Sequence, residues 1–121
     1  MKNKKTLVIG ATTNTDRYAF KAISLLVEKG HTVVAIGQNT GEVAGVKIQT
    51  KALPIKNIDT ITLYINPIRQ KEYYNYIIKA HPKRVIFNPG TENLEFLQLL
   101  ESNGIKVEVA CTLVLLTTHQ Y

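Results

Sequence analysis

The chain has 121 residues, enough for one ordinary domain, so we expect a single domain over residues 1–121 with one hydrophobic core. Fifteen Lys and Arg residues against nine Asp and Glu give a formal charge of +6, which favours an anionic partner. One cysteine excludes an internal disulfide, and the apolar runs fall far short of the roughly 20 residues that span a bilayer.

The first predicted strand covers residues 5–9 and ends at Gly10. From residue 16 to 29 the apolar residues recur at spacings of three and four, which predicts a helix with one buried face. Thr15 or Asp16 is the expected N-cap of this helix. The chain therefore opens with a strand, a short polar loop and a helix.

The second predicted strand covers residues 32–36, a run rich in β-branched residues. Residues 37–41 have the composition of a loop. Residues 46–48 are expected to form a short edge strand, and residues 53–59 to form a connector. This part of the chain is thus predicted to contribute two strands.

The second half of the chain alternates strands and helices more regularly. Residues 60–65 are the third strong strand, and Pro67 is well placed to open the helix that follows. Residues 84–87 are predicted as a strand, residues 91–102 as a helix and residues 105–110 as the last strand. Each helix is long enough to connect two parallel strands.

This alternation predicts an α/β domain with parallel strands joined by right-handed crossovers. We expect a Rossmann-like, doubly wound and mainly parallel sheet of five or six strands, with helices on both faces. In such sheets a ligand binds beyond the carboxyl ends of the strands, where the winding direction reverses. The predicted reversal lies between the loops after Ile9 and Ile65.

The stretch LVIGATTNTD, residues 7–16, has the features of a phosphate-binding loop. Gly10 allows a tight turn, the hydroxyls of Thr12 and Thr13 can donate to phosphate oxygens, and the following helix dipole favours an anion. The N-terminus of a helix disfavours a positive charge, so Arg17 at this position is better explained if an anion binds nearby. The second and third glycines of G-x-G-x-x-G are missing, so the loop is not the dinucleotide-binding motif.

The end of the second strand argues against NAD. Sheets that bind NAD place Asp or Glu at this position to bind the ribose hydroxyls. Residues 35–39 here read AIGQN and contain no acid. A ligand phosphorylated on its ribose, or one bound in another orientation, fits this sequence better.

The reactive side chains do not form a recognisable catalytic set. Cys111 follows the last strand and is most simply a buried apolar residue, and no histidine is placed by the sequence to activate it. His31, His81 and His119 are scattered along the chain. We expect no catalytic residues, no metal site and no independent catalytic activity, and we assign no function to residues 112–121.

The basic residues are dispersed and match no nucleic-acid motif, which predicts a solvated surface and argues against nucleic acid as a partner. The apolar segment after the first lysines is too short for a signal peptide, so we expect a cytoplasmic protein without membrane association. A homo-oligomer or a partner protein stays open, because the segment near Val46 and the tyrosines at 73, 74 and 76 fit an interface as well as ordinary packing.

Several motifs resemble those of the small stand-alone CoA-binding proteins, whose fold is similar to the CoA-binding domain of the succinyl-CoA ligase alpha subunit. The resemblance covers nearly the whole chain. The residues that match are Val8, Ile9, Gly10, Ala11, Thr12, Asn14 and Arg17 in the first loop, Leu26, Gly30, His31 and Val33 around the second strand, Gly45 in the next loop, and Gly90, Asn93 and Cys111 near the end.

Three positions depart from the family pattern. Gly37 and Gln38 stand where members usually have Asn-Pro after the second strand, and Ala110 stands where an acid or amide is usual. An arginine commonly follows the next central strand, whereas here Asn66 and Pro67 come first and Arg69 follows later. The departures leave open a different nucleotide or a lost activity.

The resemblance implies a site for coenzyme A or a related phosphorylated nucleotide, held by a non-catalytic binding or regulatory module. The implied cofactor-binding residues are Gly10, Ala11, Thr12, Thr13, Asn14 and Arg17 at the phosphates, Gly37, Gln38 and Asn39 near the ribose or adenine, Ile65, Asn66 and Pro67 on the opposite wall, and Gly90 at a close backbone approach. The alternatives are an NAD(P)-binding or acyl-transfer enzyme component that acts with another chain, and an interaction domain that has lost its ligand.

Overall fold

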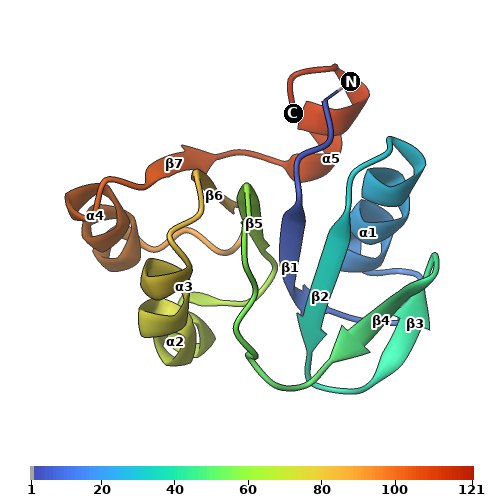
Figure 1. Cartoon of the computed structure of the whole chain (residues 1–121), viewed down its shortest axis with the longest axis horizontal. Coiled ribbons are helices and arrows are strands. Elements are labelled where there is room, and N and C mark those ends of the chain that lie inside the picture. The colour runs from blue at the N-terminus through green and yellow to red at the C-terminus, as the bar shows by residue number, and fades with distance from the viewer. Residues whose placement is uncertain (1) are drawn as a thin grey trace.

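The computed structural model describes residues 2–121, which form a three-layered α/β domain with one sheet between two layers of helices (Figure 1). The strands are β1 (Thr6–Ala11), β2 (Val33–Gly37), β3 (Gly41–Val43), β4 (Val46–Gln49), β5 (Thr60–Leu63), β6 (Arg84–Phe87) and β7 (Lys106–Val109). The helices are α1 (Tyr18–Glu28), α2 (Pro67–Gln70), the 3-10 helix η1 (Lys71–Tyr73), α3 (Tyr74–Ala80), α4 (Leu94–Ser102) and α5 (Thr112–Thr117).

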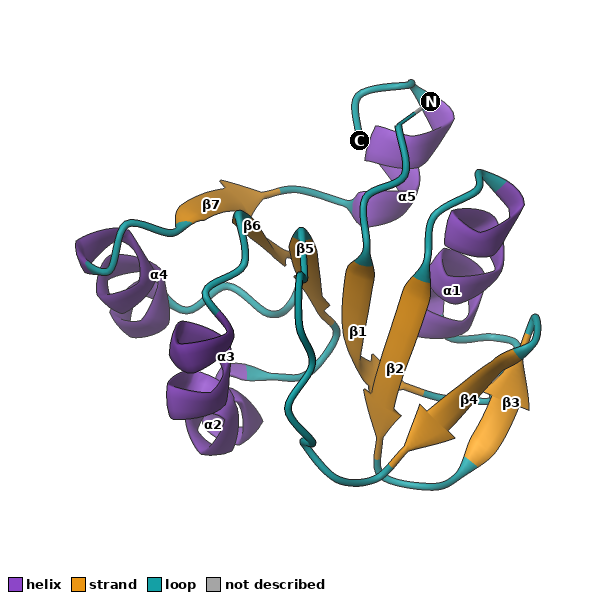
Figure 2. Ribbon diagram, in the orientation of Figure 1, coloured by secondary structure: helices purple, strands orange, loops and turns teal. Residues whose placement is uncertain are grey.

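The sheet has the order β3-β4-β2-β1-β5-β6-β7, and every neighbouring pair is parallel except β3 with β4. β1 lies between β2 and β5, so the chain winds to one side through β2 and to the other through β5 (Figure 2). The predicted doubly wound, mainly parallel fold with its reversal between the loops after β1 and β5 is therefore confirmed.

The structure describes seven strands, whereas the sequence predicted five or six. Gly41, predicted as a loop residue, begins β3, which pairs antiparallel with β4 and displaces it from the edge of the sheet. The two strands are joined by Ala44 and Gly45, which both have positive φ angles, of 50° and 83°. Such two-residue turns usually carry Asn-Gly or Asp-Gly, so the Ala-Gly sequence here did not predict a hairpin turn.

Two helices begin later than predicted because asparagine side chains hold the preceding loops. The Asp16 N–H donates to Asn14 Oδ1 at 3.0 Å, and α1 starts at Tyr18 with Arg17 as its N-cap, so neither Thr15 nor Asp16 caps it. Asn93 is the N-cap of α4, and its Oδ1 accepts from the Phe96 N–H at 3.2 Å. The helix that Pro67 opens divides into α2, η1 and α3.

Alternate residues of β1 face the two helical layers. Leu7 and Ile9 belong to the core cluster on the side of α3 and α4, whereas Val8 belongs to the cluster on the side of α1 and α5. Leu7, Val8 and Ile9 are all completely buried. A strand covered on both faces is apolar throughout, which explains why the first predicted strand is a continuous hydrophobic run.

Residues after α5 return to the amino edge of the sheet. The Tyr121 ring lies 5.0 Å from the His31 ring and 4.4 Å from the Arg84 guanidinium carbon, measured to ring centroids. Its backbone carbonyl accepts from Lys4 Nζ at 2.6 Å and from Arg84 Nη1 at 3.0 Å. These contacts fix α5 against the sheet, opposite the edge where a ligand is expected.

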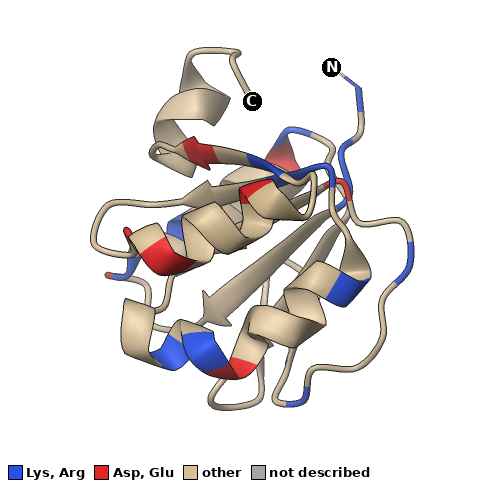
Figure 3. Cartoon of the chain, turned by 90° about the vertical axis from the view of Figure 1, so that its left-hand side faces the viewer, with Lys and Arg blue, Asp and Glu red and all other residues tan. Residues whose placement is uncertain are grey.

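Basic residues are distributed over several helices and loops, with acidic residues between them (Figure 3). Only two ion pairs form among residues 2–121, and both involve Glu108, which contacts Arg84 and Lys106 at 3.4 and 3.6 Å. None of the helices in this range is long and apolar enough to cross a membrane. The positive charge therefore remains largely uncompensated by ion pairs within the described chain.

Candidate functional site

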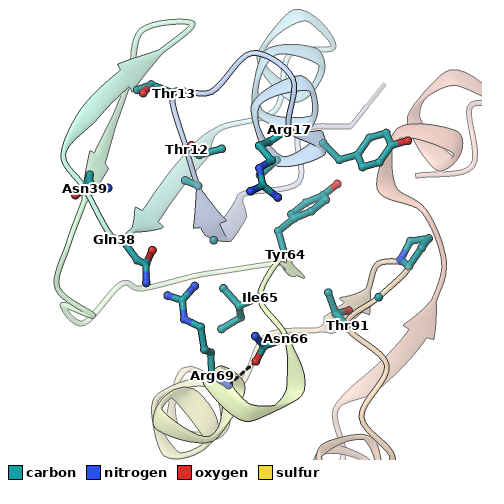
Figure 4. A pocket seen from close by; sticks show the side chains of 16 residues that line it. Thr12, Thr13, Arg17, Gln38, Asn39, Tyr64, Ile65, Asn66, Arg69 and Thr91 are labelled. Carbon is teal, nitrogen blue, oxygen red and sulfur yellow. Dashed lines mark hydrogen bonds between the residues drawn. The ribbon is translucent and has the colours of Figure 1, made fainter.

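A crevice of about 430 Å³ lies at the carboxyl edge of the sheet, at the point where its winding reverses (Figure 4). Its walls come from the β1–α1 loop, the end of β2, the β5–α2 loop and the β6–α4 loop. The lining residues are Gly10, Ala11, Thr12, Thr13, Arg17, Tyr18, Ala19, Gln38, Asn39, Tyr64, Ile65, Asn66, Arg69, Pro89, Gly90 and Thr91. The volume lies within the range of small-molecule sites, about 300–1,000 Å³.

The crevice brings together most of the residues predicted as a nucleotide site. Those that line it are Gly10, Ala11, Thr12, Thr13, Arg17, Gln38, Asn39, Ile65, Asn66 and Gly90. Their role in binding stays a prediction.

Three predicted residues do not line the crevice. Asn14 uses its side chain to hold the turn before α1, and Pro67 is the first residue of α2. Gly37 ends β2, and a Cβ there would overlap the Ala11 carbonyl oxygen. Local backbone packing accounts for all three of these residues.

Just before the β1–α1 loop, β1 contains a glycine that no other residue can replace without strain. Gly10 has a φ of 99°, and a Cβ added to it would lie 2.7 Å from the Tyr64 carbonyl oxygen. The pairing register of β1 with β2 also shifts between Ile9 and Ala11, which places Gly10 in a bulge. The glycine thus lets the loop turn while staying in contact with the end of β5.

The N-terminus of α1 faces this crevice without a side-chain cap. Arg17 is the N-cap residue, its side chain makes no capping hydrogen bond, and the first turn contains no acidic residue. Tyr18 and Ala19, at the start of the helix, line the crevice. Backbone N–H groups in a first turn have no partners within the helix and carry its positive dipole end. This arrangement favours an anion.

The charged residues among the lining are two arginines from different elements. Arg17 precedes α1 and Arg69 belongs to α2, and Figure 4 shows both side chains beside the crevice with Tyr64 and Ile65 between them. The lining includes no Asp or Glu, and neither arginine forms an ion pair within residues 2–121. The crevice is therefore electropositive.

Gln70 connects two walls of the crevice, and sequence reasoning missed it. Its Nε2 donates to the Ile65 carbonyl at 3.0 Å and to the Thr91 carbonyl at 2.7 Å, and its Oε1 accepts from Asn93 Nδ2 at 2.9 Å. The side chain is completely buried. A buried glutamine in a short amphipathic stretch gave no sequence signal, because Thr91 and Asn93 come from a loop more than 20 residues further along the chain.

Asn88 directly precedes the crevice residue Pro89 and joins the ends of β5 and β6 to α5. Its Nδ2 donates to Thr62 Oγ1 at 2.6 Å and to the Leu63 carbonyl at 2.8 Å, while its Oδ1 accepts from the Thr112 N–H at 2.9 Å. Beside this network, burial raises the pKa of Tyr64 far above its usual value, so the phenol stays protonated. The ends of β5 and β6 are thus held together by neutral hydrogen-bonding groups.

Six lining residues were absent from the predicted set: Tyr18, Ala19, Tyr64, Arg69, Pro89 and Thr91. Tyr18 and Ala19 follow the predicted loop directly, so extending the site into the first helical turn would have included them. Tyr64 was predicted as a strand residue, although the strand ends at Leu63 and frees it to face the crevice.

The residues considered for catalysis lie outside the crevice lining. Cys111 is half-buried at the N-cap position of α5, and His31 is buried at the amino edge, where its Nδ1 accepts from the Lys4 N–H at 3.0 Å. Residues 2–121 contain no group of three His, Cys, Asp or Glu side chains suited to a metal ion.

Comparisons with known proteins agree with this architecture. The model of one family, the CoA binding domain, matches residues 4–117. A crystal structure of an uncharacterized protein is 47% identical over 100% of both chains, with a TM-score of 0.97. A hypothetical protein from Pyrococcus horikoshii OT3 is 28% identical, with a TM-score of 0.83 over 93% of this chain and 81% of that one.

A structure of cell-free ID.343 from Thermus thermophilus is similar in fold alone, at 22% identity, with a TM-score of 0.85 over 98% of this chain and 91% of that one. The search of curated proteins gives no match.

Proposed function

Because this chain belongs to the CoA binding domain family, we propose that it binds coenzyme A or a related phosphorylated nucleotide at the carboxyl edge of its sheet. The observation that carries this proposal is the β1–α1 loop, which leads into the uncapped N-terminus of α1 beside an electropositive crevice. A phosphorylated ligand supplies the negative charge and the acceptor oxygens that such a loop recognises.

The phosphates of the ligand bind at the β1–α1 loop. Its backbone amides and the hydroxyls of Thr12 and Thr13 donate to phosphate oxygens, and Arg17 adds charge-assisted hydrogen bonds. Gln38 and Asn39 lie at the end of β2, where the ribose or adenine is expected, and Ile65 forms part of the opposite wall. The residues present therefore fit a coenzyme A nucleotide.

The role proposed for this chain is binding or regulation rather than independent catalysis. The crevice lining offers amides, hydroxyls, carboxamides and guanidinium groups, which hold a ligand. The thiol of Cys111 and the three imidazoles, which more often carry nucleophilic attack or proton transfer, are not among the lining residues. When bound, coenzyme A supplies a thiol that a partner enzyme can acylate.

Thermal unfolding of the purified protein with coenzyme A, dephospho-CoA, NAD, NADP and ATP tests the proposal. A ligand at one hundred times its dissociation constant stabilises the folded state by about 2.7 kcal/mol. For a domain of this size that corresponds to a rise in Tm of about 10 °C. A rise with coenzyme A supports the proposal, whereas a rise with NAD and none with coenzyme A contradicts it.

A protein that responds to none of these compounds would instead fit an interaction domain without a ligand. An Arg17→Ala variant tests the phosphate site without disturbing the fold, because this exposed side chain makes no capping hydrogen bond. We expect the variant to unfold at nearly the wild-type temperature without ligand and to show a smaller rise with coenzyme A. An unchanged rise would remove Arg17 from the site.

A further inference from the structure

Arg69 has a position in the crevice that phosphate binding at the β1–α1 loop does not explain. It lies in α2, whose start is fixed because Asn66 Oδ1 accepts from the Arg69 N–H at 2.9 Å. Figure 4 shows the guanidinium directed toward Gln38, which comes from the end of β2. Arg69 therefore extends from the wall opposite Arg17 toward a different part of the crevice.

The surroundings of Arg69 leave its charge available to a ligand. The side chain is half-buried, no ion pair joins it to a carboxylate in the described part of the chain, and the lining residues around it are uncharged apart from Arg17. A half-buried guanidinium without a carboxylate gains most from an anion that accepts two hydrogen bonds from its planar donor fork. Phosphate groups have this geometry.

The position of the end of β2 indicates which phosphate of a nucleotide Arg69 would bind. In doubly wound sheets the ribose of a bound nucleotide lies at this strand end, where an acid binds free ribose hydroxyls and an arginine accommodates a phosphate on the ribose. Gln38 and Asn39 occupy this place, with no acid, and Arg69 points toward it from across the crevice.

We infer that Arg69, together with Gln38, binds a phosphate carried on the ribose of the ligand and so selects ribose-phosphorylated nucleotides. This inference rests on the proposed function and assigns two anion sites to the same crevice. Arg17 and the β1–α1 loop bind the phosphates that link the nucleotide to its remaining part. Arg69 distinguishes coenzyme A from dephospho-CoA, which lacks only the ribose phosphate.

Isothermal titration calorimetry of the wild-type protein, Arg69→Ala and Arg17→Ala with coenzyme A and dephospho-CoA tests this assignment. We expect the wild-type protein to bind coenzyme A about tenfold or more tightly than dephospho-CoA, as one charge-assisted contact implies. Arg69→Ala should weaken coenzyme A binding by a similar factor, with little change for dephospho-CoA. Arg17→Ala should weaken both and preserve their ratio.

The outcomes separate this inference from the proposed function. If the wild-type protein binds both compounds equally, or if Arg69→Ala weakens both by the same factor, the assignment of Arg69 is wrong while nucleotide binding stands. The wild-type protein and Arg69→Ala are also titrated with NAD and NADP. If neither coenzyme A compound binds, but the wild-type protein binds NADP more tightly than NAD and Arg69→Ala removes this difference, the ribose-phosphate site stands and the choice of coenzyme A fails. A wild-type protein that binds none of the four overturns both.

Discussion

Replacing Asn88 by alanine is expected to destabilise the fold by about 2–4 kcal/mol. Asn88 is 2% exposed and makes hydrogen bonds to Thr62, Leu63 and Thr112. Thr112 is completely buried, so leaving its N–H without an acceptor lowers the free energy of unfolding by about 1–3 kcal/mol by itself. The Leu63 carbonyl loses a donor, and removal of the side chain leaves a small cavity.

Differential scanning calorimetry measures the effect as a fall in Tm of roughly 8–16 °C, since about 4 °C corresponds to 1 kcal/mol in a domain of this length. Asn103→Ala is the matched control, because Asn103 also donates to a backbone carbonyl, that of Leu99 at 2.8 Å, but is exposed. We expect the control to change stability by less than about 0.5 kcal/mol.

Asn88→Asp separates the hydrogen bonds from the cavity, because it retains the side-chain volume. It replaces the Nδ2 donor with an oxygen that faces the Leu63 carbonyl, and it buries a charge. We expect it to destabilise the fold as Asn88→Ala does. If Asn88→Asp is as stable as wild type, or if Asn88→Ala costs no more than Asn103→Ala, the hydrogen bonds of Asn88 do not hold the ends of β5 and β6 together.

Two further predictions use denaturant unfolding. Gly10→Ala should lower the free energy of unfolding by at least about 1 kcal/mol more than Gly30→Ala does. Both glycines have positive φ, but a Cβ at Gly30 meets no atom within 4 Å. Equal losses would mean that the contact of Gly10 with the end of β5 does not affect stability. Burial lowers the pKa of His31 below 6.5, so the unfolded state binds its proton more readily and stability falls as the pH drops through this value. His31→Gln should reduce that fall between pH 7.5 and 5.5, and a variant whose stability changes with pH just as that of the wild type does would contradict the reasoning.

Much of the fold could be predicted because the local patterns agree with the tertiary structure. The continuous apolar run of residues 5–9 reflects a central parallel strand covered on both faces, and Pro67 marks the start of a helix through its fixed φ. The strand β3 was missed because Ala44 adopts a positive φ, which alanine rarely does. That conformation depends on the pairing of β3 with β4.

Prediction of the candidate site depended on whether its residues are close in sequence. Thr12, Thr13 and Arg17 were found because a glycine loop between a strand and a helix has a recognisable pattern. Arg69 was noted only as a departure from a family pattern, and Gln70 had no signal at all. Their roles depend on the direction of α2 and, for Gln70, on the β6–α4 loop, whose Thr91 lies 21 residues further along the chain.

The sequence by itself determined the alternation of strands and helices, and with it the parallel sheet, the position of its reversal and the loop that begins at Gly10. These features follow from local preferences and from the restricted handedness of crossovers. The tertiary structure decided which side chains share the crevice. It placed Arg69 toward Gln38 and connected two walls through Gln70, because such contacts join strand ends that are adjacent only after the sheet has formed.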